Sequence, residues 1–135
     1  EKYQLSFVKH IGELSYPDSL ILQRSAHILL VIDNPIKDPK KAMFFPSKLL
    51  DYISMKRRIL AITRKGGATS TVMEELLGEV YEHEEFSKIS ESIKNCLIAF
   101  DEKNKNYFVA ENPSEKYEVS NNVVRLKKLI KKYSK

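Results

Sequence analysis

One short stretch of this chain joins a helix pattern directly to a strand pattern. Pro46 and Ser47 are residue types that begin helices, and the apolar residues after them recur at helical spacing through Ile53. Residues 59–62 then form a brief apolar run, which is typical of a buried strand. A helix followed at once by a buried strand is half of a βαβ unit, so this stretch predicts parallel strands connected by helices.

Strand and helix patterns alternate along the rest of the chain as well. Residues 5–8 and 28–32 predict strands, and the second is an unbroken apolar run of the kind that is covered on both faces of a sheet. We therefore expect an α/β fold, Rossmann-like, with a mostly parallel sheet and helices on both faces. The other expected elements are helices over 17–26, 87–100 and about 121–133 and a strand over 79–81. A further helix is expected with Thr69 as its N-cap and with Gly78, in a left-handed conformation, at its end. It is expected to pack through Val72, Met73, Leu76 and Leu77.

The composition is that of a globular domain. A chain of 135 residues with 42% apolar and 30% charged residues is usual for one domain, which we expect to span residues 1–135. The net charge of +5 fits an anionic partner, but no nucleic-acid-binding motif accompanies it. We therefore do not expect nucleic acid as a partner.

The cysteine and the histidines form no metal-ligand pattern. Cys96 is the only cysteine, which excludes an intrachain disulfide and a cysteine-built zinc site. Its place in the apolar repeat of residues 87–100 predicts a core thiol. We expect no metal site, and surface or strand-end positions for the scattered histidines, which are His10, His27 and His83.

No stretch predicts a secretion signal or a membrane span. The apolar runs 28–32 and 59–62 are far shorter than the roughly twenty residues that cross a bilayer. The first residues lack the apolar core and cleavage site of a signal peptide. We therefore expect a cytoplasmic protein.

Four segments of the chain carry motifs of one known family, in that family's order. The strongest is 45–52, FPSKLLDY, which matches a proline-Ser-Lys-Leu-aromatic-Glu-Tyr pattern. Residues 5–12 match a strand that ends in a valine-x-phenylalanine-x-glycine pattern, and 66–78 match a glycine turn followed by a helix with glutamates. Residues 25–31 match a residue-alanine-aspartate pattern before an apolar strand, with His27 where the family has aspartate. Together these segments resemble the C-terminal, nucleotide-sugar-binding domain of GT-B-type retaining glycosyltransferases of family four.

The resemblance implies a function that this chain would share with a second domain. It implies the nucleotide-sugar-binding portion of a glycosyltransferase, without the first strands of its domain and without the N-terminal acceptor-binding domain. In the GT-B architecture a hexosyl group is transferred to a glycan or lipid-linked acceptor in the cleft between two domains. We therefore expect a nucleotide diphosphate sugar as donor substrate, no cofactor, no catalytic residue in this chain and no activity in isolation. The alternative is a non-catalytic α/β signalling or assembly module that has lost the ligand.

The same resemblance assigns nucleotide-sugar binding to seven residues. Asp51 falls where the family has a glutamate that clamps the ribose, and a carboxylate can accept two hydrogen bonds from ribose hydroxyls. The turn into the helix and the glycine pair would offer backbone N–H groups to the diphosphate. The seven residues are Phe45, Pro46, Ser47, Lys48, Asp51, Gly66 and Gly67.

Each of these positions also has a purely structural interpretation. Asp51 is a favourable anion in the first turn of a helix, and Ser47 is a good N-cap. Lys48 would be solvated, and the two glycines would form a turn. Met43 stands where the family has the first glutamate of its motif, so half of that motif is missing.

Two surfaces, a strand edge and the face of a helix, are expected to make contacts with other segments or other molecules. Without preceding strands, the strand 28–32 would expose an edge, which we expect either to pair with residues 5–8 or to be buried in a homodimer. The helix over about 121–133 carries basic residues opposite an apolar side. This pattern is typical of a packed terminal helix with a solvated face, or of weak contact with the inner face of an anionic membrane.

Overall fold

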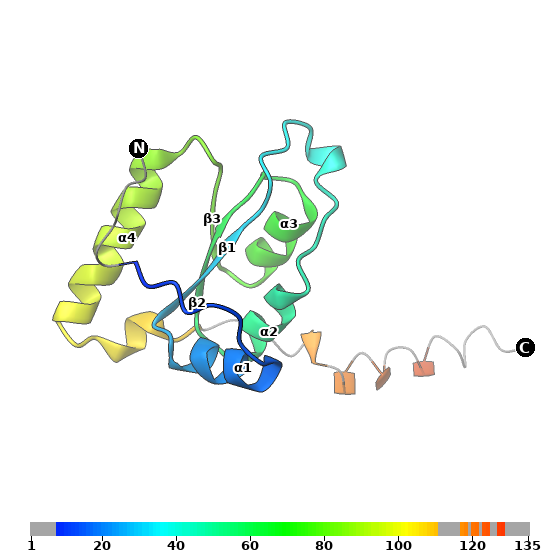
Figure 1. Cartoon of the computed structure of the whole chain (residues 1–135). Helices are drawn as coiled ribbons and strands as arrows, with labels where there is room; N and C mark the ends of the chain where they lie inside the picture. The colour runs from blue at the N-terminus through cyan, green and yellow to red at the C-terminus, as the bar shows by residue number, and fades with distance from the viewer. Residues whose placement is uncertain (1–7, 111–116, 119, 122, 125–126, 129–135) are drawn as a thin grey trace, which may run out of the picture.

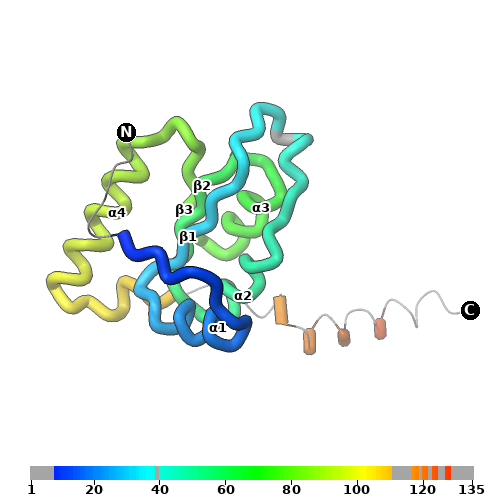
Figure 2. The backbone as a smooth tube through the Cα atoms, viewed as in Figure 1, coloured from blue at the N-terminus to red at the C-terminus, as the bar shows by residue number. Residues whose placement is uncertain are grey.

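Three parallel strands in the order β1-β2-β3 form the sheet of this α/β fold (Figure 1). The computed structural model describes residues 8–110, 117–118, 120–121, 123–124 and 127–128 (Figures 1 and 2). The strands are β1 (Ile28–Ile32), β2 (Arg58–Ile62) and β3 (Glu79–Tyr81). The predicted bounds of the first and last of these are confirmed, and β2 begins one residue earlier than predicted.

Helices precede, connect and cover the strands. Helices α2 and α3 lie on one side of the sheet and α4 on the other, which confirms the predicted Rossmann-like α/β fold with a parallel sheet and helices on both faces (Figure 1). The elements are α1 (Tyr16–Ser25), the short 3-10 helix η1 (Pro39–Lys41), α2 (Lys48–Ser54), α3 (Ala68–Glu75), α4 (Phe86–Asp101) and the 3-10 helix η2 (Lys105–Phe108).

The main core lies between α2, α3 and one face of the sheet. Alternate residues of β1 and β2 point into it, because successive side chains of a strand face opposite sides. Full burial of a Val, Leu, Ile or Met side chain stabilises the fold by about 1.5–3 kcal/mol, and burial of the smaller Ala61 contributes less. The buried members are Leu29, Val31, Ile59 and Ala61 from the strands and Leu49, Ile53, Met73 and Leu76 from the helices or their ends.

The other face of β1 is largely uncovered, so the expectation of cover on both faces is wrong for this strand. Leu30 and Ile32 are 48% and 56% exposed. Ile28 alone on this face packs against the second core cluster, which contains Cys96 of α4 and Phe108. Helix α4 therefore covers the beginning of β1 and leaves its later residues open.

The buried side of helix α4 carries small residues. Cys96 is buried, as predicted, together with Ser92 and Ala99. The larger apolar residues of the same helical repeat were expected to pack in the core, but Ile93 and Leu97 are 50% and 61% exposed. Small side chains let a helix approach closely, and the larger ones flanking them are then left at the surface.

The start of α3 differs from the prediction. Its N-cap is Gly67, and Thr69 lies inside the helix, buried, with its hydroxyl donating to the Phe44 carbonyl oxygen at 3.4 Å. The helix thus begins at Ala68, before Thr69, the hydroxyl residue that sequence preference favours as the N-cap. The reason is a contact with residues before α2, which sequence spacing does not reveal.

The end of α3 also differs. Leu77, expected in the core, is 82% exposed, and it is Leu77 that takes the left-handed conformation, with φ of 54°. The Gly78 N–H donates to the Met73 carbonyl oxygen at 2.8 Å, as in a Schellman motif. A Cβ on Gly78 would lie 2.2 Å from Cε of the buried Met73 side chain, so any larger residue at 78 would force this side chain to shift.

Two predicted elements fall largely outside the described residues. Of the strand expected over 5–8, the structure describes only Val8, which belongs to no strand. Of the terminal helix expected over about 121–133, only a few separate residues are described. Just before it, the Tyr117 hydroxyl bonds to the Glu75 carboxylate, and burial together with this carboxylate raises the pKa of Tyr117 to about 12. Among the described helices, none combines the length and apolar character needed to cross a membrane.

The outer edge of β1 pairs with no strand of the described residues, so burial of this edge in a homodimer stays a prediction. If two copies pair there, Leu30→Lys will convert the dimer to a monomer in sedimentation velocity, because a lysine keeps its ammonium hydrated and blocks edge pairing. Leu77→Lys, at a leucine that is also exposed, is the matched control and should remain dimeric. A parent protein that sediments as a monomer at all concentrations contradicts the prediction.

Candidate functional site

A cavity of about 330 Å³ opens at the carboxyl ends of β1 and β2. Ligands of open α/β sheets bind at this edge, because the loops that leave parallel strands meet there. The wall is formed by the residues that follow β1, those that follow β2 and the start of α2. Its polar and charged members are Asp33, Asn34, Ser47, Lys48, Thr63 and Arg64.

Asp33 is the best-fixed polar residue of this wall. The Thr63 hydroxyl donates to Asp33 Oδ2 at 2.7 Å, and Thr63 is almost fully buried. The Asp33 carbonyl oxygen accepts a hydrogen bond from His83 Nε2 at 2.7 Å. These contacts tie together the ends of β1 and β2 and the turn after β3, so the carboxylate is held without needing a ligand.

Three of the seven predicted site residues line the cavity: Pro46, Ser47 and Lys48. Ser47 has helical backbone angles and its side chain makes no capping hydrogen bond, so the hydroxyl is not committed to the helix. Lys48 is exposed at the first position of α2. Phe45 does not line the cavity and packs, partly buried, against the main core.

The two glycines form a turn beside the cavity and are not among its lining residues. Gly66 adopts φ of 78°, which favours glycine. The Gly67 N–H donates to the Arg64 carbonyl oxygen at 3.2 Å, and the Ala68 N–H donates to the Ala42 carbonyl oxygen at 2.9 Å. A Cβ on Gly67 would lie 2.8 Å from Ala42 Cβ. These backbone groups are thus used to dock the loop before α2 onto the start of α3.

Asp51 lies one turn into α2, outside the residues that line the cavity. Its Oδ1 accepts a hydrogen bond from the Tyr16 hydroxyl of α1 at 3.0 Å. This hydrogen bond and the negative charge of Asp51 raise the pKa of Tyr16. In the structure, Asp51 therefore joins α2 to α1.

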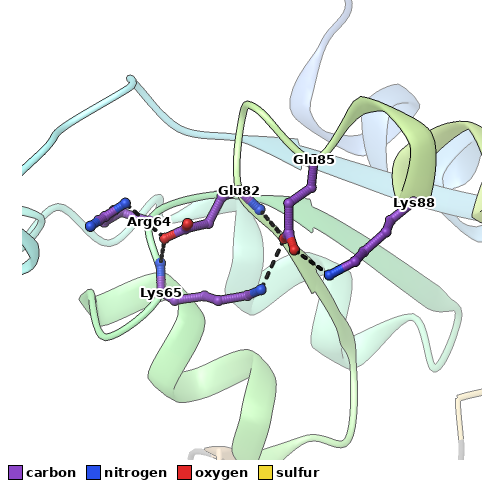
Figure 3. Close-up of polar contacts among 5 residues, drawn as sticks. All are labelled: Arg64, Lys65, Glu82, Glu85 and Lys88. Atoms are coloured by element: carbon purple, nitrogen blue, oxygen red, sulfur yellow. Dashed lines mark hydrogen bonds and ion pairs between the residues drawn. The ribbon is translucent and has the colours of Figure 1, made fainter.

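Charged residues form a network between the end of β2 and the start of α4 (Figure 3). Arg64 pairs with Glu82 at 2.9 Å. Lys65 Nζ and Lys88 Nζ lie 2.9 Å and 2.6 Å from the Glu85 carboxylate. Arg64 thus belongs both to this network and to the cavity wall, and its buried Nε has no hydrogen-bond partner among the described residues.

Sequence reasoning missed Asp33 and Arg64. Asp33 directly follows β1, and Arg64 is the second residue after β2, so their places in the sequence carried a usable signal. Polar residues that directly follow neighbouring parallel strands come together at one edge of the sheet. Applied to this chain, that rule would have selected Asp33 and Thr63, and Arg64 is the next residue after Thr63.

The cavity wall combines two cations, of which Arg64 is paired with Glu82, with hydroxyl, amide and carboxylate groups, which suits a small polar ligand. Comparisons with family models, with curated proteins and with solved structures found no match to this chain. Among the described residues, no group of three or more His, Cys, Asp or Glu side chains could hold a metal ion.

The charge network makes a testable contribution to acid stability. Hydrogen bonds from Lys88, from the Glu82 N–H and from Lys65 lower the pKa of Glu85 from 4.5 to about 2. Because the pKa is lower in the folded state, the stabilisation is complete above pH 4.5 and is lost as the pH falls through about 2. Glu85→Gln should therefore make the free energy of unfolding less dependent on pH in this range, as measured by urea denaturation.

The neighbouring Glu84→Gln is the matched control, because Glu84 is exposed and forms no ion pair with a described residue. Its pH dependence should follow that of the parent. Equal pH dependence of the Glu85 variant and the parent would contradict the assignment of the network to acid stability.

Proposed function

We propose that this chain is the nucleotide-diphosphate-sugar-binding portion of a glycosyltransferase, and that the donor's diphosphate binds in the cavity at the carboxyl ends of β1 and β2. One observation carries the proposal. The FPSKLLDY segment, which resembles the family's donor-binding segment, contributes Pro46, Ser47 and Lys48 to the wall of a cavity at the edge where open α/β sheets bind ligands.

The charges of the wall support an anionic ligand. Lys48 and Arg64 come from different elements, the start of α2 and the end of β2, and both line the cavity. A diphosphate between them would gain charge-assisted hydrogen bonds, which are about twice as strong as neutral ones. The Ser47 hydroxyl and the Asn34 amide are suited to the hydroxyl groups of a sugar.

The size of the cavity supports a site that a second domain completes. Its volume of about 330 Å³ lies at the low end of the range of roughly 300–1,000 Å³ for small-molecule sites. A cavity of this size suits a diphosphate with part of one sugar. The remainder of the donor, and the acceptor, would then contact the acceptor-binding domain, so transfer requires that domain.

The competing function is a non-catalytic α/β module without a ligand. Two observations favour it: the N–H groups of Gly67 and Ala68 are used within the protein, and Asp51 is bonded to Tyr16. A module of this kind would keep the fold and bind no nucleotide. Titration distinguishes the two functions.

Isothermal titration with uridine and guanosine diphosphates should give a saturable heat for at least one nucleotide. Lys48→Ala should weaken that binding by about tenfold or more, because a charged hydrogen bond contributes about 1.5–3 kcal/mol. Lys94→Ala, at an exposed lysine of α4, is the matched control and should bind like the parent. No heat with any nucleoside diphosphate would favour the module, and sugar transfer by the chain alone would contradict the need for a second domain.

The ribose clamp is tested by a pair of variants at the contact between α1 and α2. If Asp51 accepts hydrogen bonds from a ribose, Asp51→Ala should weaken nucleotide binding by about 1.5–3 kcal/mol. Tyr16→Phe removes the same contact between the helices and keeps the carboxylate, so its binding should be unchanged. If Asp51→Ala and Tyr16→Phe both bind like the parent, Asp51 only joins the two helices.

A further inference from the structure

A second and larger cavity lies at the opposite end of the sheet. It has a volume of about 570 Å³ and lies where α1 ends, β1 begins and the end of α4 meets η2. Residues before β1 and the residue before β2 line it, so it is at the amino ends of the strands. It shares no lining residue with the cavity at the carboxyl ends.

Three aromatic rings form the apolar part of this second cavity. The His27 ring lies edge-to-face against both Phe100 and Phe108, with ring centroids 5.0 Å apart in each pair. Phe108 is 4% exposed and fixes the arrangement, while Phe100 is 54% exposed. The protein thus presents an aromatic surface to the cavity, as many small-molecule sites do.

The charged residues that line the same cavity are mainly cationic. Arg57, Lys103 and Lys105 line it together with a single carboxylate, Asp101. Arg57 Nε and Nη2 donate to the Arg24 carbonyl oxygen at 3.1 Å and 2.8 Å, which fixes the guanidinium near the mouth. A guanidinium has further N–H groups for a second acceptor.

These lysines also follow the end of α4, where cations stabilise the helix dipole. That role explains a lysine after a helix, but it explains neither the aromatic rings nor Arg57, which comes from another part of the chain. The combination of aromatic rings with cations from two segments in one cavity lining is complementary to an amphipathic anion.

We propose that this second cavity binds a small amphipathic carboxylate, with its apolar body against His27, Phe100 and Phe108 and its carboxylate at Lys103, Lys105 and Arg57. The site is independent of the proposed nucleotide-sugar site. A ligand here would contact the end of α4 and the start of β1 at once, and would stabilise the contact between them.

The test compares two ligands of equal chain length and opposite charge. In nuclear magnetic resonance titrations, octanoate should shift the amide signals of His27, Phe100 and Phe108 in a saturable way, and octylammonium should bind at least fivefold more weakly. Equal affinity for the two ligands, or no saturable shift at these amides, would overturn the proposal. Uridine diphosphate should not compete, which keeps this test separate from that of the proposed function.

Charge reversal provides the second arm of the test. The double variant Lys103→Glu/Lys105→Glu should lose at least fivefold in octanoate affinity and should gain affinity for octylammonium. The matched control, Lys40→Glu/Lys41→Glu, changes the net charge equally at exposed lysines of η1 and should bind octanoate like the parent. Thermal unfolding midpoints distinguish binding of the ligand from stabilisation of the α4 dipole as the role of the two lysines. If the double variant Lys103→Glu/Lys105→Glu unfolds at a lower temperature but binds octanoate like the parent, the lysines serve only the helix dipole. That result would overturn the proposal.

Discussion

The parallel pairing of β1 with β2 is the constraint from which the rest of the structure follows. The register places Ile28 beside Arg58 and Ile32 beside Ile62, so the residues that leave the two strands are neighbours. Asp33 and Thr63 can therefore share a hydrogen bond, and the cavity wall is assembled at the carboxyl ends. The same register aligns the alternate apolar residues that α2 and α3 cover, so a shift by one residue would remove both the core and the site.

Local patterns in the sequence were sufficient to predict the helices and strands of the fold. They did not predict where α3 begins and ends, or which residues of β1 and α4 are exposed. The run at β1 is apolar and is followed by the turn residues 33–35, and β3 begins directly after Gly78, which is why these bounds could be predicted. The ends of α3 depend on contacts with Ala42 and Met73, and the exposure of Leu30 and Leu97 depends on where α4 lies. Such contacts arise from the packing of separate elements, and no residue pattern within one element encodes them.

The candidate site was predictable to a similar extent. Pro46, Ser47 and Lys48 begin the helix of a βαβ unit, and that position alone brings them to the carboxyl edge of the sheet. The partner of Asp51 could not be predicted, because Tyr16 lies 35 residues earlier in a separate helix. Both possible roles of Asp51, binding a ligand and joining two helices, require its carboxylate. The sequence alone does not distinguish these roles, because the contact with Tyr16 depends on where α1 lies.

The close approach of Ala42 to Gly67 limits which sequences this fold can tolerate. A Cβ on residue 67 would meet both Ala42 Cβ, at 2.8 Å, and the Ala42 carbonyl oxygen, at 2.9 Å. The same carbonyl oxygen accepts the N–H of Ala68 at 2.9 Å, so the loop cannot retreat without losing the hydrogen bond that docks it on α3. A side chain at 67, or a larger residue at 42, would therefore force this loop and the start of α3 apart. Two positions 25 residues apart in the numbering thus have to be chosen together.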